Sequence, residues 1–254
     1  MELMTTAKRR PGIDLRKTST ASLLLLGAMA VGILTGCVAY LYPGIDLQVS
    51  TLFYQPERGF YGQSSPAIAL ARSTFYTLYE ATCVIAVVGL VITLVRRRTW
   101  LGISALRWLF LVLCLGVGPG LVGNLALKDN WGRARPVQTV EFGGQKAFSG
   151  PLTPTDQCQR NCSFVAGEAT TIFAALFAAA FLFPPYAGRL IAAGVVFGSL
   201  AGAIRMSQGA HFLTDVIFAG VIMAITVAIL DLMFDALEDM NGAKCDSISG
   251  TPTQ

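Results

Sequence analysis

The chain has 254 residues, of which 54% are hydrophobic and only 13% are charged, and its mean hydropathy is +0.59. This composition excludes an ordinary soluble domain and predicts a membrane protein, since a membrane-spanning helix needs roughly 20 mostly apolar residues. The formal net charge of +4 gives no support to nucleic-acid binding, because membrane orientation and an anion site are enough to explain it.

Apolar runs of about spanning length follow one another along the chain. They lie near 20–42, 74–95, 107–127, 164–183, 190–204 and 212–234. The fifth is short and carries Gly194, Gly198 and Gly202 at a spacing of four residues, a small-residue face that predicts close approach by a neighbouring helix. We therefore predict an all-α, polytopic membrane helix bundle with about six transmembrane helices.

The runs divide the chain into three segments. Residues 1–19 form a basic lead, 20–239 a six-helix membrane domain with an outer loop at 128–163, and 240–254 a tail whose composition predicts disorder. Acidic residues close the last run, and we interpret them as a solvated helix end. They are Asp231, Asp235, Glu238 and Asp239.

Basic residues beside the first two runs predict the orientation. Lysines and arginines precede the first run, and Arg96, Arg97 and Arg98 close the second, which places both flanks in the cytoplasm by the positive-inside rule. Six crossings then put both termini in the cytoplasm and the loop 128–163 outside. LTGC at 34–37 resembles a lipoprotein processing site, but the apolar run continues past it through VAYLY, so we interpret it as part of the first helix.

Two of the six cysteines, Cys158 and Cys162, share the outer loop in the stretch DQCQRNC. A disulfide is chemically permitted outside the cytoplasm. Because only three residues separate the two cysteines, the sequence leaves open whether they are bridged.

The outer face also carries basic residues that the orientation rule does not explain. In KDNWGRARP, Lys128 and Arg135 lie seven positions apart where the third run ends, and Pro136 follows. In NCSFVAGEAT, a turn at Ala166 and Gly167 opens the fourth run, so free backbone N–H groups face outward. A helix start of this kind is a ready anion site.

The third outer stretch, RMSQGAHFLTD, contains the only histidine of the chain. Arg205 precedes His211, and Asp215 follows it by four residues, so imidazole and carboxylate share one helical face. A neutral imidazole can attack phosphorus if a carboxylate fixes its tautomer and stabilises the charge that develops. Cations and helix-start amides can hold the equatorial oxygens of the transferring phosphoryl group. His211 is therefore a candidate nucleophile.

These three stretches, Lys128 to Pro136, SFVAGE from Ser163 to Glu168, and Arg205 to Asp215, keep one order and lie on one membrane face. They resemble the three-part signature of the type 2 phosphatidic acid phosphatase superfamily of membrane lipid phosphatases, over roughly 128–215. The resemblance implies a phosphoric monoester hydrolase acting on a membrane lipid, with no cofactor and no obligate protein partner. One histidine and no cluster of outer carboxylates predict no metal site, so we expect a metal-independent enzyme.

The resemblance also implies a role for each matching residue. His211 is the nucleophile of the expected phosphohistidine, and Asp215 orients it. The phosphate is bound by three side chains and by the backbone at the start of the fourth helix. These phosphate-binding residues are Lys128, Arg135, Arg205, Ala166 and Gly167.

The second stretch departs from the usual Pro-Ser-Gly-His of the family, because Val165, Ala166, Gly167 and Glu168 stand there. The third stretch has Ile204 where the family usually has a serine. The second histidine of the family, usually the acid that protonates the leaving oxygen, is therefore absent. Either Glu168 donates that proton or the leaving group departs with little help, and we predict the acid role for Glu168.

The substrate is less sharply indicated than the reaction. The length, the six spans, the outer segment DLQVSTLFY (46–54) and the Glu-for-His change are similar to bacterial lipid A phosphatases, which remove the 1- or the 4′-phosphate. Undecaprenyl diphosphate and phosphatidylglycerol phosphate are the alternative substrates. The resemblance implies a bacterial inner membrane protein whose active site faces the periplasm.

A membrane transporter is the alternative of another class. In that case Arg205, His211 and Asp215 would line an ion or substrate path inside the membrane. The pattern favours the enzyme, because these charged residues cluster at helix ends on one face, whereas a transporter is expected to place some of them near the midplane.

Overall fold

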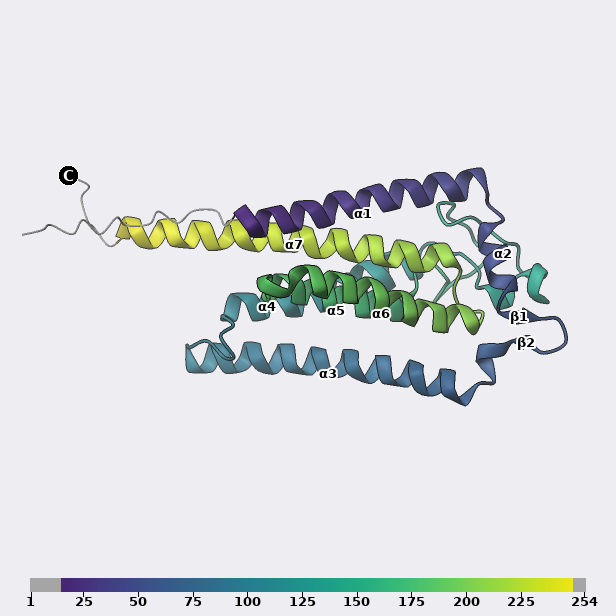
Figure 1. The fold of residues 1–254 in the computed structure, drawn as a ribbon, viewed down its shortest axis with the longest axis horizontal. Coiled ribbons are helices and arrows are strands. Elements are labelled where there is room, and N and C mark those ends of the chain that lie inside the picture. The colour runs from purple at the N-terminus through teal and green to yellow at the C-terminus, as the bar shows by residue number, and fades with distance from the viewer. Residues whose placement is uncertain (1–14, 249–254) are drawn as a thin grey trace, which may run out of the picture.

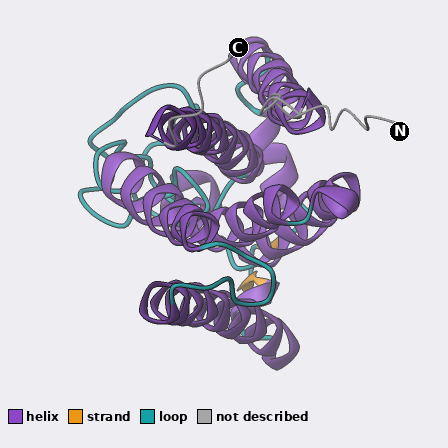
Figure 2. Ribbon diagram, turned by 90° about the vertical axis from the view of Figure 1, so that its left-hand side faces the viewer, coloured by secondary structure: helices purple, strands orange, loops and turns teal. Residues whose placement is uncertain are grey.

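The computed structural model describes residues 15–248, and most of them are helical. The long helices run side by side as one bundle, and the short strands and α2 gather at one end of it (Figure 1). The view along the helices shows the two strands behind the bundle, at its far end (Figure 2). The long helices are α1 (Leu15–Leu41), α3 (Pro66–Arg96), α4 (Ala105–Leu115), α5 (Gly167–Leu182), α6 (Ala187–Ser207) and α7 (Leu213–Ile248). This architecture confirms the predicted all-α polytopic bundle.

Five helical segments of the described chain are long and apolar enough to cross a membrane. They are Thr20–Leu41, Pro66–Arg96, Ala105–Lys128, Pro184–Ser207 and Leu213–Glu238. The fourth predicted run, 164–183, corresponds to α5, which has only 16 residues and packs against α4, α6 and α7. Large apolar side chains stay exposed along α1 and α3, as expected for helices whose outer faces meet lipid.

The glycine face of α6 is the surface on which α5 and α7 pack. A Cβ on Gly194 would lie 2.7 Å from the ring of Phe177, and one on Gly198 would lie 2.6 Å from the ring of Phe173. A Cβ on Gly202 would overlap Val216 of α7. The predicted close approach is therefore confirmed, because only residues without a side chain leave room for these neighbours.

The third apolar run is not a uniform α-helix. The α-helix α4 ends at Leu115, and a π-helix, η2 (Gly116–Lys128), continues it to Lys128. Pro119 lies inside η2, where it cannot donate a helical hydrogen bond, and four glycines of this segment weaken the regular helix further. The wider turns change the angular position of Lys128, the last residue of η2, relative to a regular α-helix.

Short elements cover the end of the bundle where the outer stretches meet. They are α2 (Ile45–Thr51), β1 (Tyr54–Gln55), β2 (Gly59–Phe60) and the single turns η1 (Tyr61–Gln63), η3 (Pro136–Gln138) and η4 (Val140–Phe142), while η5 (Pro184–Tyr186) joins α5 to α6. The strands β1 and β2 pair antiparallel with Tyr54 opposite Phe60. Phe60, Phe142 and Phe212 form a buried aromatic cluster that anchors this cover beside the turn carrying His211.

One prediction about the opposite end of the bundle is wrong, and another stays a prediction. The helix α7 continues to Ile248, past residue 240, where the tail is expected to begin. Three of the acidic residues are not a solvated end, since Arg107 of α4 forms ion pairs with Asp231, Asp235 and Glu238. The remainder of the expected tail, 249–254, and most of the basic lead, 1–14, lie outside the described residues.

Candidate active site

His211 lies in the short turn between α6 and α7, at the end of the bundle that carries the strands (Figure 1). Its Nδ1 is 2.7 Å from the carbonyl oxygen of Ser163. A carbonyl oxygen only accepts, so Nδ1 carries the hydrogen and Nε2 carries the lone pair. Nε2 has no hydrogen-bond partner in the part of the chain that the structure describes. It is therefore the nitrogen that is available for attack.

The imidazole of His211 is completely buried. Burial disfavours the charged form and lowers the pKa of His211 below its ordinary value, and the ammonium of Lys128 adds to this effect. The carboxylates of Asp215 and Glu168 oppose it without cancelling it. His211 is consequently neutral at neutral pH, which is the state that a nucleophile requires.

Asp215 acts on the imidazole mainly through Ser163. The carboxylate oxygen Oδ2 is 3.8 Å from His211 Nδ1, too far for a hydrogen bond. The same oxygen accepts the hydroxyl of Ser163 and the backbone N–H of Phe212, the latter at 2.8 Å. Because the carbonyl of Ser163 holds the Nδ1 hydrogen, Asp215 orients His211 indirectly. Its charge can still stabilise an imidazolium at this distance.

Arg133 is fully buried and joins Asp215 to the N-terminal part of the chain. Its Nη1 donates to Oδ1 of Asp215 and, at 3.0 Å, to the hydroxyl of Thr214, while Nη2 donates to Asp46 at 2.7 Å. Asp46 of α2 also accepts the backbone N–H of Thr214 at 2.9 Å. The guanidinium carbon lies 4.3 Å from the ring centre of Phe212. Two buried carboxylates therefore share one buried cation directly behind His211.

Lys128 reaches the start of α5. A Cβ on Gly167 would lie 2.7 Å from Lys128 Nζ, so glycine is needed for the ammonium to approach the backbone. The helix begins at Gly167 without a side-chain cap, which leaves first-turn N–H groups beside the ammonium. The N–H of Ala166 is not among them, because it donates to the carbonyl of Asp215 at 3.2 Å. The N–H of Ala166 is therefore not free for the predicted phosphate contact, whereas the contact of Gly167 stays a prediction.

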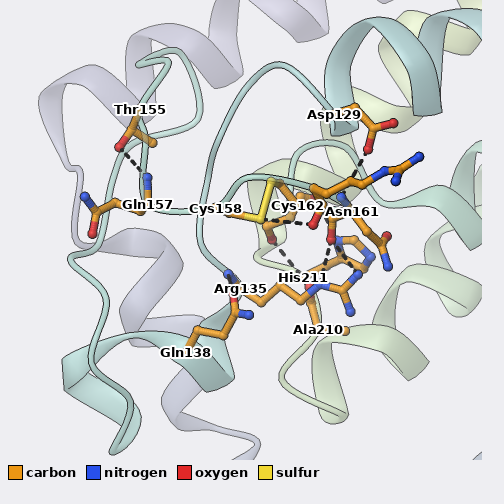
Figure 3. Close-up of a disulfide and its surroundings, with 12 residues drawn as sticks. Asp129, Arg135, Gln138, Thr155, Gln157, Cys158, Asn161, Cys162, Ala210 and His211 are labelled. Atoms are coloured by element: carbon orange, nitrogen blue, oxygen red, sulfur yellow. Dashed lines mark hydrogen bonds between the residues drawn. A yellow bond between two sulfur atoms is a disulfide. The ribbon is translucent and has the colours of Figure 1, made fainter.

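Arg135 is held by the loop that contains the disulfide (Figure 3). Its Nε and Nη2 both donate to the carbonyl oxygen of Asn161, at 3.2 and 2.8 Å. Cys158 and Cys162 form a disulfide on either side of Asn161, with 5.6 Å between their Cα atoms. The backbone N–H of Asn161 is fixed in turn by the carboxylate of Asp129 at 3.1 Å. The bridge that the sequence left open thus encloses the residue that positions Arg135.

Glu168 lies between two arginines. Arg72 of α3 donates to Oε1 through Nε and Nη2, at 3.1 and 3.0 Å, and Arg205 Nε lies 3.2 Å from Oε2. The side chain of Glu168 is only 18% exposed. Two guanidinium groups at these distances stabilise the ionised form of Glu168.

The three predicted phosphate-binding side chains come together, although they arise from different segments. Lys128 ends η2, Arg135 lies in the outer loop, and Arg205 is in the last turn of α6. Lys128 interacts electrostatically with both arginines and with Glu168. We call Lys128, Arg135 and Arg205 the cationic cluster. With the amide at the start of α5, it supplies hydrogen-bond donors and positive charges of the kind that bind phosphate groups.

Several residues around this position were missed by the sequence analysis. Ser163 begins the second stretch, but nothing in its local pattern indicates that its carbonyl faces the imidazole. Asp46 lies 87 residues before its partner Arg133, and Arg72 lies 96 residues before its partner Glu168, so no local spacing could pair them.

Comparison with known proteins identifies the family. The model of the PAP2 superfamily matches residues 105–237, about half of the chain, and this range includes all three outer stretches. The chain belongs to the PAP2 superfamily. Glu168, which stands where this PAP2 family usually has a histidine, lies inside the matched range. Asp46 and Arg72 lie outside it.

Relatives of this PAP2 protein include three named lipid A 4′-phosphatase. The protein from Francisella tularensis subsp. novicida is 46% identical over 119 residues, which cover 46% of this chain and about half, 53%, of the relative. The proteins from Rhizobium leguminosarum and Rhizobium etli are each 32% identical, over 194 and 226 residues, covering 69% and 82% of this chain and 81% and 85% of the relatives. No solved structure gives a significant match.

Proposed function

We propose that this PAP2 protein is an integral membrane phosphatase that removes the 4′-phosphate of lipid A through a phosphohistidine. One observation carries the chemistry: a buried, neutral imidazole with a free Nε2 lies near Lys128, which belongs to a cluster of three cations that can hold a phosphate. The choice of the 4′ over the 1 position rests on the relatives, which are named lipid A 4′-phosphatase.

In the first half of the proposed reaction, Nε2 of His211 attacks the phosphorus. The N–P bond forms as the bond from phosphorus to the sugar oxygen breaks, and the departing oxygen takes a proton. The cationic cluster and the amide of Gly167 hold the three equatorial oxygens. Asp215 stabilises the charge that develops on the imidazole.

We propose Glu168 as the residue that moves this proton. In the free protein its carboxylate is paired with Arg72 and Arg205, so it must take up a proton when the substrate phosphate becomes the partner of Arg205. Glu168 then protonates the leaving oxygen. In the second half of the reaction, water attacks the phosphorus, the N–P bond breaks, and the proton of that water returns to Glu168. His211 ends neutral and phosphate is released.

The proposed orientation places the active site in the periplasm and both termini in the cytoplasm, in a bacterial inner membrane. The basic residues at Arg96, Arg97 and Arg98, at the far end of α3 from the site, support it through the positive-inside rule. The disulfide beside Arg135 supports it independently, because disulfides persist in the periplasm. We also propose that the reaction needs no metal ion, since the cationic cluster can provide the charge stabilisation.

The function is tested with the purified protein in detergent and lipid A that carries both phosphates. We expect loss of the 4′-phosphate alone, detected by mass spectrometry with fragmentation, and an undiminished rate in chelator. The control is lipid A that lacks the 4′-phosphate, which should remain unchanged. Release of the 1-phosphate, or hydrolysis only of an isoprenoid diphosphate, would contradict the proposed substrate, and a loss of activity in chelator restored by magnesium would contradict the metal-free mechanism.

The contact between Gly167 and Lys128 gives a more local prediction. Gly167→Ala should push the ammonium away from the helix start and lower kcat/KM by about 10- to 100-fold, since misplacing a binding group by about 1 Å has this effect. The fold should survive, because the displaced atom is the end of a flexible side chain. Gly188→Ala is the matched control, as its new Cβ meets no atom within 4 Å. Equal activity of the two variants would show that Lys128 does not bind the substrate phosphate.

A further inference from the structure

Arg72 belongs to none of the three signature stretches and lies outside residues 105–237, the range that the family model matches. It is in the second turn of α3, yet its guanidinium reaches across to α5 and donates twice to Oε1 of Glu168. Arg205, a signature residue, contacts the other oxygen. Glu168 thus lies between Arg205, which belongs to the signature, and Arg72, which belongs to no motif. We call these two arginines the Glu168 clamp.

The position of Arg72 is at the edge of the phosphate site. Arg72 and Arg205 contact the two oxygens of the same carboxylate, so Arg72 stands next to the cationic cluster. The side chain of Arg72 is 49% exposed, whereas that of Arg205 is 10% exposed. Arg72, the outer end of the clamp, is therefore accessible to solvent. Arg205, its inner end, is buried in the site.

An ionised Glu168 competes with the substrate for the inner end of this clamp. A carboxylate and a phosphate both bind a guanidinium through charge-assisted hydrogen bonds, so Arg205 cannot serve both fully. If Arg205 were its only arginine, Glu168 would follow Arg205 and the nearby Lys128, with which it already interacts. Arg72 donates to Oε1 of Glu168, so Glu168 keeps this partner when Arg205 turns to the phosphate and a proton is taken up at Oε2.

We propose that Arg72 is a positioning residue of this phosphatase, which holds Glu168 at the edge of the site and so frees Arg205 to bind the substrate phosphate. The inference rests on the proposed phosphatase function but not on the identity of the lipid. A positioning role differs from that of a fourth phosphate ligand, because Arg72 then affects phosphate binding only through Glu168.

The experiment measures the inhibition constant of inorganic phosphate against hydrolysis of an activated aryl phosphate, in a double-mutant cycle. Arg72→Gln should raise this constant by roughly tenfold, the equivalent of one charge-assisted hydrogen bond lost to a competing carboxylate. In the Glu168→Gln background, where no carboxylate competes, Arg72→Gln should change it by less than about twofold. The constant is a binding quantity, so it can be measured at whatever rate a variant retains.

Two results would overturn the inference. An unchanged constant in Arg72→Gln would show that the clamp has no role in phosphate binding. An equal rise in both backgrounds would show that Arg72 acts on the phosphate directly. Arg72→Lys is the second variant, and it should give an intermediate constant because one ammonium cannot donate as a planar fork.

Two further measurements keep the result interpretable. Arg58→Gln, which removes an exposed arginine from the β1–β2 hairpin at the same end of the bundle, controls for the loss of one positive charge and should leave the constant unchanged. The lipid A assay separates this inference from the proposed substrate: a chain that hydrolyses the aryl phosphate but not lipid A would refute the substrate and leave the test of Arg72 intact.

Discussion

His211→Ala is expected to abolish turnover, with a loss on the order of 10⁴-fold or more, because removal of a nucleophile eliminates the covalent route. The chain contains no other imidazole that could replace it. The measurement is phosphate release from lipid A and from an activated aryl phosphate. In parallel, rapid quenching of the wild type with radiolabelled substrate should trap an acid-labile, base-stable phosphoenzyme that the variant lacks.

The pH dependence tests the same assignment without a mutation. Burial lowers the pKa of His211 in the folded protein below its ordinary value of 6.5. Protonation removes the lone pair of Nε2, so kcat/KM should fall only as the pH drops through this lowered pKa, and the acid limb should lie below about pH 6.5. An acid limb at or above that pH would conflict with a neutral, buried nucleophile, and a labelled phosphoenzyme in His211→Ala would conflict with the assignment itself.

Arg133→Met is expected to destabilise the fold more than any other single change in the site. It leaves the carboxylates of Asp46 and Asp215 buried without their shared cation, and removing one partner from a buried ion pair costs about 3–5 kcal/mol. The free energy of unfolding, measured by denaturant titration in mixed micelles, should fall by that amount. Activity should fall as well, since the carboxylate that orients Ser163 loses its anchor.

The control for this prediction neutralises one of the two carboxylates that Arg133 contacts. Adding Asp46→Asn to Arg133→Met removes one of the two uncompensated charges, so the double variant should recover part of the lost stability. Arg58→Met removes an exposed arginine from the same end of the bundle and should change stability by less than about 0.5 kcal/mol. Full stability of Arg133→Met would mean that the two carboxylates do not need the cation.

Local patterns were sufficient for much of this protein. Apolar runs predict spanning helices because lipid forces each segment to satisfy its own backbone hydrogen bonds, and each of the six predicted runs is helical in the structure. The glycine spacing of α6 predicted close packing for the same local reason, since four residues return to one helical face. The order and spacing of the three outer stretches were enough to indicate phosphate chemistry.

Other predictions failed where a distant partner decides the outcome. The acidic end of the last run looks solvated in isolation, but Arg107 reaches it from α4. The N–H of Ala166 looks free at a helix start, but the carbonyl of Asp215 accepts it. In each case a group that is 49 or more residues away supplies the partner, and no local pattern records it.

By itself, therefore, the sequence determined the membrane bundle, the residues that gather at its outer end and the type of chemistry they indicate, because these depend on composition and on spacing along single helices. Only the tertiary structure decided how those residues act on one another: that Ser163 rather than Asp215 holds the Nδ1 hydrogen of His211, and that Arg72 and Arg205 share Glu168. Hydrogen bonds and ion pairs depend on distances of about 3 Å between groups from different helices, and packing alone sets those distances.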